Sequence, residues 1–211
     1  MEVKHMRTFL EVIMTRRSIR DFKEGNIPPE DVERILQAGI MAPSPGNSQP
    51  WRFHVIRGKT KEKFVEVLKN IKTIPPLWHQ LVVRSMGIVP VVIAVENPIF
   101  TNKDDSSSSN AFKVCGETKL KTTFINKDDI TSLGSLLGTA ASVENMLLAA
   151  HSLGYGSVWL AFPPILEAVK EIIEIHGEIV GVLPVGHPAD HQKEYVNRSR
   201  KPMEEVTKFY D

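Results

Sequence analysis

Residues 42–51 read APSPGNSQPW and separate a predicted helix from a predicted strand. The residues Pro28 to Asp31 begin the helix, since proline and acidic side chains suit a first turn, and apolar residues follow at helical spacing. Pro43 and Pro45 end it, because a residue that precedes a proline disfavours helical geometry. Residues 51–56 alternate and are aromatic or β-branched, which predicts a strand.

Helices and strands alternate along the rest of the sequence. The length of 211 residues suits a single domain over residues 1–211. The apolar pattern predicts further helices over residues 8–14, 59–71, 77–86, 131–151 and 163–176, and further strands over 88–95, 154–161 and 178–185. The strand at 88–95 is typical of a central, buried strand, and Pro90 fits best at its start. This order of elements indicates the α/β or the α+β class.

Two regions lack the pattern of a core element. Residues 97–129 carry the run DDSSSSN and little periodicity, and a stretch of this length inside a compact domain is usually functional or disordered. Its aromatic residues Phe100, Phe112 and Phe124 could close as a lid over a ring, and a surface insertion without a role is the alternative. Residues 187–211 are predicted to form a C-terminal arm.

The predicted helix at 131–151 is apolar on nearly all sides. Leu136, Val143 and Leu147 lie on one stripe, while Leu133 and Leu137 make other faces apolar as well. Such a helix is buried in a core or across a subunit interface. Together with the arm, it predicts a dimer, because exposed apolar surface on this scale normally marks an interface.

Composition and charge exclude several classes of function. A formal net charge of +1 does not indicate a nucleic-acid-binding surface. The single cysteine, Cys115, rules out a disulfide framework and a cysteine-based metal site. His187 and His191 have metal-ligand spacing only on a helix, which Pro188 disfavours, so no metal is expected. The N-terminal residues are too charged for a signal peptide, and no membrane-spanning helix is predicted, so we expect a cytoplasmic protein.

Three polar segments could bind a ligand. Residues 16–20 read RRSIR, and guanidinium groups offer forked donors that match phosphate oxygens, although a solvated helix end is the alternative. Residues 42–51 hold Ser, Asn and Gln in a loop stiffened by proline, and such polar groups could bind the edge of a heterocyclic ring or a chain of hydroxyl groups. An ordinary turn is the alternative. Residues 198–201 could form a second wall for a phosphate, or a solvated tail.

Other phosphate-binding and catalytic motifs are missing from the sequence. It contains no G-x-G-x-x-G dinucleotide fingerprint and no G-x-x-x-x-G-K-[ST] phosphate loop. No serine lies in a G-x-S-x-G setting, so a hydrolase triad has no support. No side chain is predicted to act as acid, base or nucleophile.

The order RRSIRDF, APSPGNSQPW, GYGSVWLA, LPVGHP and RSRKP, from Arg16 to Pro202, resembles the nitroreductase family of flavoproteins. The resemblance implies an α+β fold with a central mixed or antiparallel sheet flanked by helices, and an intertwined homodimer that binds FMN at its interface. It further implies that the flavin phosphate is held by Arg16, Arg17, Ser18, Arg20, Arg198 and Arg200. The ribityl chain and ring would contact Pro43, Ser44, Pro45, Asn47 and Gln49, from the same or the partner subunit.

The resemblance also implies a role for the backbone at Leu160 and Ala161, which would donate a hydrogen bond toward flavin N5. In one familiar version of the pattern Glu-Gly follows this strand, whereas this chain has Ala161 and Phe162. A backbone donor is kept, and the larger side chain should alter the substrate pocket.

The implied activity is hydride transfer from NADH or NADPH, through FMN, to an aromatic nitro compound, a quinone or a related acceptor by a ping-pong mechanism. One alternative is a biosynthetic relative that uses FMN for dehydrogenation or ring modification. The other is a flavin-binding module without turnover.

Overall fold

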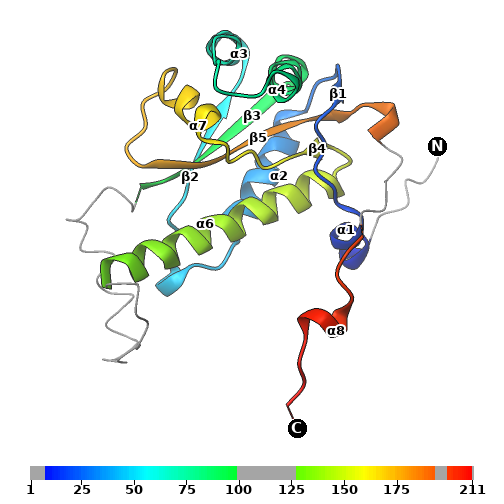
Figure 1. The fold of residues 1–211 in the computed structure, drawn as a ribbon, viewed down its shortest axis with the longest axis vertical. Helices are drawn as coiled ribbons and strands as arrows, with labels where there is room; N and C mark the ends of the chain where they lie inside the picture. The colour runs from blue at the N-terminus through cyan, green and yellow to red at the C-terminus, as the bar shows by residue number, and fades with distance from the viewer. Residues whose placement is uncertain (1–7, 99–126, 193–198, 211) are drawn as a thin grey trace.

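The computed structural model describes residues 8–98, 127–192 and 199–210, and Figure 1 shows how their elements are arranged. The helices are α1 (Phe9–Thr15), α2 (Pro29–Ile40), α3 (Gly58–Lys69), α4 (Pro76–Ile88), α6 (Lys127–Ser152), α7 (Pro163–Lys170) and α8 (Met203–Val206). The strands are β1 (Phe22–Lys23), β2 (Arg52–Ile56), β3 (Val91–Asn97), β4 (Gly156–Ser157) and β5 (Glu178–Pro188). Two short 3-10 turns are η1 (Pro45–Asn47) and η3 (Asp190–Gln192).

The sheet is organised around β5, which pairs with β1, β3 and β4. The order is β1-β5-β3-β2, β4 also pairs with β5, and every strand pair is antiparallel. All seven residues of β3 are buried, so the predicted central strand is confirmed. Pro90 immediately precedes it, where a missing N–H removes no bond from the sheet.

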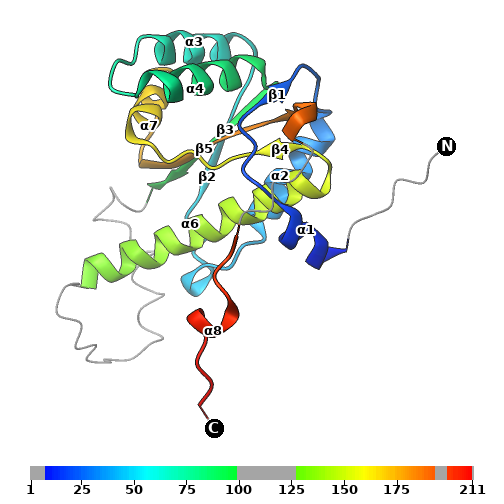
Figure 2. The ribbon, with the colours of Figure 1, turned by 45° about the vertical axis from the view of Figure 1, so that its right-hand side comes forward.

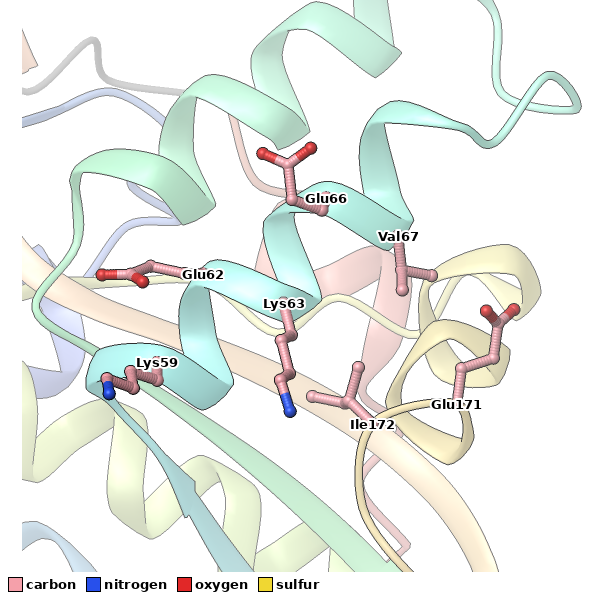
Figure 3. Close-up of a pocket in the computed structure, with 7 residues that line it drawn as sticks. All are labelled: Lys59, Glu62, Lys63, Glu66, Val67, Glu171 and Ile172. Carbon is pink, nitrogen blue, oxygen red and sulfur yellow. The ribbon is translucent and has the colours of Figure 1, made fainter.

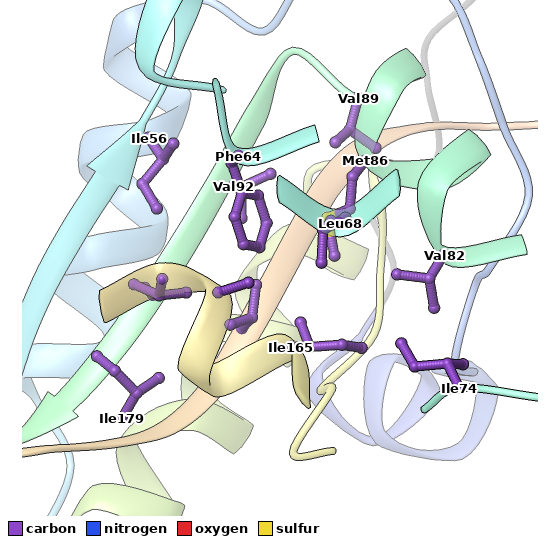
Figure 4. Close-up of a cluster of buried hydrophobic side chains, with 14 of the residues drawn as sticks. Ile56, Phe64, Leu68, Ile74, Val82, Met86, Val89, Val92, Ile165 and Ile179 are labelled. Carbon is purple, nitrogen blue, oxygen red and sulfur yellow. The ribbon is translucent and has the colours of Figure 1, made fainter. Parts of the chain in front are cut away.

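Helices cover both faces of the sheet, and the side chains of β3 alternate between two cores. Val92 and Ala94 pack with α3, α4 and α7 in the core drawn in Figure 4. Val91, Ile93 and Val95 pack with α2 and α6 on the other face. Figures 1 and 2 show α6 running along the opposite side of the sheet from α3 and α4. The α+β class is confirmed, because all the strand pairs of this sheet are antiparallel, whereas an α/β fold has a mostly parallel sheet.

The helix α6 is longer than predicted, because it begins at Lys127 and not at residue 131. Its stretch Leu133–Ser152 is also long and apolar enough to cross a membrane, with a mean hydropathy of 1.2, contrary to the expectation from the sequence. In the fold, Val143 and Met146 are fully buried with side chains of α2 and the sheet. Of this stretch, 44% is buried inside the protein, and the core helices of soluble proteins pass the same test of length and composition.

Several predicted boundaries were wrong. The strand expected over residues 154–161 is reduced to Gly156–Ser157 and a single bridge from Leu160 to Val182. The helix expected to reach residue 176 ends at Lys170, and Gly177 then passes close to the backbone of Asn97 and Pro98 before β5 begins. The last strand continues beyond residue 185 to Pro188, where it pairs with β1.

The region expected to be irregular, 97–129, contributes Asn97 to β3 and residues 127–129 to α6. Residues 99–126, with the three predicted lid aromatics and Cys115, lie outside the described residues, as does Arg198. In the predicted arm, residues 199–206 and 208–210 are exposed, and the segment extends away from the sheet (Figures 1 and 2).

Candidate active site

The segment Arg16–Arg20 leaves the end of α1 and is held by its backbone against β4. Ser18 and Ser157 form a parallel bridge, and the Ile19 amide donates to the Ser157 carbonyl at 3.0 Å. Gly156 permits this approach, since a Cβ there would lie 2.8 Å from Ile19 Cγ2. The basic segment is therefore part of the sheet edge and not a freely solvated helix end.

The arginine side chains of this segment are partly engaged. Arg16 Nε lies 3.2 Å from Glu144 Oε1 on α6. Arg17 Nη1 donates to the carbonyls of Met14 and Arg16 at 2.9 and 2.8 Å, and its buried Nε has no hydrogen-bond partner among the described residues. A guanidinium carries five N–H donors, so these contacts leave capacity for an anion.

The end of α1 is fixed to α6 by a second contact. Thr15 Oγ1 lies 2.9 Å from His151 Nε2, and His151 is buried. Glu144 and His151 are seven residues apart, which places them two turns apart on similar sides of the helix. The position of the basic segment is thus set by α6 as well as by β4.

The loop of residues 42–51 has buried ends and an exposed centre. Ala42 and Trp51 are buried, whereas Asn47 and Gln49 are exposed. The φ angles of Gly46, Asn47 and Gln49 are 58°, 57° and 47°, a left-handed geometry that is uncommon for residues other than glycine. Within the loop, the Gln49 amide donates to the Ser44 hydroxyl at 2.9 Å. The loop presents two carboxamide side chains in a conformation that must be held in place.

The backbone amides after β4 differ in their availability. The Leu160 amide donates to the Val182 carbonyl at 3.0 Å, so this predicted donor is already used within the sheet. The Ala161 amide takes part in none of the backbone hydrogen bonds found among the described residues, and Ala161 is exposed. Phe162 follows it with 44% of its surface exposed. Of the two predicted donors, the geometry favours Ala161.

The structure brings only some of the predicted residues together. Residues 16–20 and 157–161 share one sheet edge, whereas the loop at 42–51 packs on Gly134 and Gly138 in the first half of α6. Gly138 and His151 are 13 residues apart, or about 20 Å along the helix axis. Both ribbon views place α1 and the loop toward opposite ends of α6 (Figures 1 and 2). Arg200 is exposed on the C-terminal segment.

Other polar features of the described residues include none of the predicted cofactor-binding residues. A shallow groove between α3 and the turn after α7 is lined by charged residues of α3 and by Glu171 and Ile172 (Figure 3), and it contains no predicted cofactor-binding residue. His191 pairs with Asp21 at 3.1 Å. No group of three potential metal ligands was found in residues 8–98, 127–192 and 199–210.

The model of the nitroreductase family matches residues 13–187 of the chain, which includes both the basic segment and the polar loop. The chain belongs to the nitroreductase family. The predicted resemblance is confirmed, and the mixed or antiparallel sheet expected for such proteins is antiparallel in all its strand pairs here.

Relatives within the nitroreductase family match nearly the whole chain. A protein of Archaeoglobus fulgidus, named as a candidate NADH dehydrogenase/NAD(P)H nitroreductase, is 32% identical over 90% of this chain and 91% of its own length. A candidate nitroreductase from Desulfovibrio desulfuricans, solved in complex with FMN, is 26% identical with a TM-score of 0.64, and 97% and 98% of the two chains are covered. A candidate NAD(P)H:FMN oxidoreductase from Staphylococcus epidermidis shares the fold with a TM-score of 0.71 at 19% identity, over 100% and 99% of the two chains.

Sequence reasoning missed the contribution of α6 to the candidate site. Glu144 and His151 hold the basic segment, and Gly134 and Gly138 receive the loop. The four-residue spacing of the two glycines, which places them on one face of a helix, was a signal available in the sequence. No signal in the sequence indicated which segment would pack on that face.

Proposed function

We propose that this protein is an FMN-dependent oxidoreductase that transfers a hydride from NADH or NADPH to an aromatic nitro compound, a quinone or a related acceptor. The observation that carries the proposal is the attachment of the basic segment Arg16–Arg20 to Ser157 of β4. Ala161, whose amide takes part in none of the backbone hydrogen bonds found among the described residues, lies four residues after Ser157. The names of the Archaeoglobus relative and the FMN complex of the Desulfovibrio relative support it.

The residues present fit a flavin phosphate and ring. Ser18 lies beside Ser157, and four residues of extended chain span at most about 14 Å, comparable with the length of FMN from phosphate to ring. The buried Nε of Arg17, which has no hydrogen-bond partner among the described residues, is a further donor in the basic segment. Arg16, Arg17, Ser18 and Arg20 would bind the phosphate, with Arg198 and Arg200 as a second wall.

The protein's own groups would bind and orient the reactants. FMN would supply the redox chemistry, namely hydride transfer from a reduced nicotinamide to an acceptor that binds in the same place, and such a shared site predicts ping-pong kinetics. Ala161 N–H would hold the ring edge at N5, and the amides of Asn47 and Gln49 would contact the ribityl chain and ring, with Pro43, Ser44 and Pro45 beside them. Phe162, exposed beside Ala161, would border the acceptor.

The protein is further proposed to act as a homodimer. The apolar side chains Phe9, Leu10 and Met14 of α1 are 69–72% exposed, and Leu137 of α6 is 61% exposed. Exposed apolar side chains on two helices that contact each other are typical of an interface.

The partner subunit would supply the polar loop. In one chain the loop and the end of α1 contact α6 about 20 Å apart. A two-fold interface repeats each surface patch in the opposite direction, so the loop of one subunit can face the basic segment of the other. FMN would then lie at the subunit interface, with both subunits contributing to each site.

The test begins with the purified protein, which should be yellow, release FMN on denaturation and scatter light as a dimer of the 23.7 kDa chain. Arg20→Ala and Arg200→Ala should each raise the Kd for FMN about 10–150-fold, the effect of one lost charge-assisted hydrogen bond. Arg34→Ala is the matched control, since Arg34 lies on α2 and pairs with Asp31.

Three outcomes would contradict parts of this proposal. A colourless protein that does not take up FMN would overturn the function as a whole. Unchanged FMN affinity in both arginine variants would show that these side chains are solvated and do not bind the phosphate. A flavin-binding protein that does not oxidise NADH or NADPH would be the binding module, and turnover of other ring compounds alone would identify the biosynthetic alternative.

A further inference from the structure

The polar loop stores backbone strain that the loop alone does not offset. Asn47 and Gln49 have positive φ angles, an unfavourable geometry that persists only where the surrounding structure fixes it. Hydrogen bonds inside the loop link Gln49 to Ser44 and Ser48 to Pro45. They close the turn on itself, and they do not fix its position relative to the rest of the protein.

The first contact that fixes the loop is a pair of glycines on α6. A Cβ on Gly134 would lie 3.0 Å from Pro45 Cγ. A Cβ on Gly138 would lie 3.1 Å from Ser44 Cβ and 3.3 Å from the Pro43 carbonyl oxygen. The loop therefore rests so close to the backbone of the helix that a side chain at either glycine would force it to shift by a few tenths of an ångström.

The second contact is made by the hydroxyl groups of Ser135 and Thr139, which directly follow the two glycines and lie on the adjacent side of α6. Thr139 Oγ1 lies 2.8 Å from the Pro50 carbonyl oxygen and 3.2 Å from Asn97 Nδ2. Ser135 Oγ donates to Asn97 Oδ1 at 3.0 Å. Thr139 and Asn97 are fully buried. This network ties the end of the loop, the last residue of β3 and α6 together.

We propose that Gly138 and Thr139 are positioning residues that fix the carboxamides of Asn47 and Gln49 for the flavin, although neither touches it. This inference rests on the proposed function. The glycine row sets how closely the loop approaches α6, and the hydroxyl of Thr139 sets where the loop ends. Because Asn47 and Gln49 lie between these two anchors, a displacement at either anchor moves both amides.

The sharpest test is Gly138→Ala, because it separates positioning from stability. Alanine in a helix interior is favoured over glycine, so the helix itself should be no less stable. The new methyl group must push the loop by a few tenths of an ångström. We expect the Kd for FMN to rise about tenfold and the absorption spectrum of bound FMN to change, with the Tm of the FMN-free protein unchanged or higher.

Gly87→Ala is the matched control, since Gly87 also lies in a helix and a Cβ there meets nothing within 4 Å. It should leave FMN affinity at the wild-type value. A second pair of variants tests the other anchor. Thr139→Val removes the hydroxyl and should also raise the Kd for FMN about tenfold, and Thr139→Ser, which keeps the hydroxyl, should restore it.

The outcomes distinguish this inference from the proposed function. If the wild-type protein binds no FMN, the proposed function fails and this inference fails with it. If the wild type binds FMN and Gly138→Ala binds it equally well, the positioning role is wrong and the proposed function stands. Equal weakening by Gly87→Ala, or a fall in Tm that accompanies every loss of affinity, would assign these residues a structural role only.

Discussion

Replacing Glu96 by glutamine should destabilise the protein in a pH-dependent way. Glu96 lies in β3 and is fully buried. Its Oε2 accepts from His54 Nε2 at 2.7 Å and its Oε1 from the His176 amide at 3.0 Å. Arg52 Nη1 lies 3.9 Å away. Burial alone would raise the pKa of Glu96, but hydrogen bonds from His54 and from the amides of His176 and Gly177 outweigh it and lower the pKa.

The magnitude follows from the contacts that glutamine keeps and loses. Its carbonyl can still accept from the His176 amide, so one bond survives. The bond from His54 to a charged oxygen is lost, and hydrogen bonds to charged groups contribute about 1.5–3 kcal/mol. We expect a loss of about 2 kcal/mol in the free energy of unfolding at pH 7, or roughly 4–8 °C in Tm for a chain of this size.

The sign of the pH dependence is set by the lowered pKa. The folded protein binds fewer protons at Glu96 than the unfolded chain, so the carboxylate contributes its stability above the unfolded pKa of about 4.3. That contribution is lost as the pH falls below this value, through the folded pKa. The difference between wild type and Glu96→Gln should therefore hold from pH 7 to about pH 5 and shrink in more acidic solution.

Urea denaturation of both proteins, at matched protein and FMN concentrations, measures this difference across the pH range. Glu66→Gln is the control, because Glu66 forms an exposed pair with Lys69, and such pairs contribute about 0–1 kcal/mol. Equal stability of Glu96→Gln and wild type at pH 7 would refute the reasoning. A difference that persisted unchanged at pH 3 would show that the charge is not its source.

Three further predictions concern the two cores and one buried phenol. Burial and the hydrogen bond to Asp31 raise the pKa of Tyr155 to about 12, so its contribution to stability should be complete below pH 10 and be lost as the pH rises toward 12. Absorbance titration of the wild type and of Tyr155→Phe measures this pKa, and a tyrosine that titrates near pH 10 would contradict the prediction. Gly181→Ala would place a Cβ 2.2 Å from Trp159 Nε1 and should cost about 1–3 kcal/mol with a change in tryptophan fluorescence, and an unchanged spectrum would show that the ring is held elsewhere. Phe64→Ala, in the fully buried core of Figure 4, should lower the free energy of unfolding by about 3–5 kcal/mol, and a loss below 1 kcal/mol would mean that the core closes over the cavity.

Short elements show where prediction from sequence reached its limit. The strands β1 and β4 have two residues each, too few for a periodic pattern, and they exist because β5 pairs with both. The stretch after β4 has strand composition, yet only Leu160 pairs with β5. A two-residue strand gains its hydrogen bonds from a partner that lies distant in sequence, so local composition could not predict it.

The sequence by itself determined the longer elements and the local chemistry. The helical spacing of α2 and α3, the apolar run of β3 and the clusters at residues 16–20 and 42–51 are local patterns, and periodicity and side-chain type suffice to read them. The order of the two clusters also sufficed to suggest the family, which the match over residues 13–187 confirmed.

Only the tertiary structure decided which of these groups meet. It assigned the Leu160 amide to Val182, paired Arg16 with Glu144, and seated the polar loop on Gly134 and Gly138. Each of these contacts joins residues more than 20 positions apart, and its formation depends on packing of the whole core and on no local preference. The separation of the loop from the basic segment along α6 likewise follows from helix geometry, because the two contact residues of α6 that lie far apart along its axis.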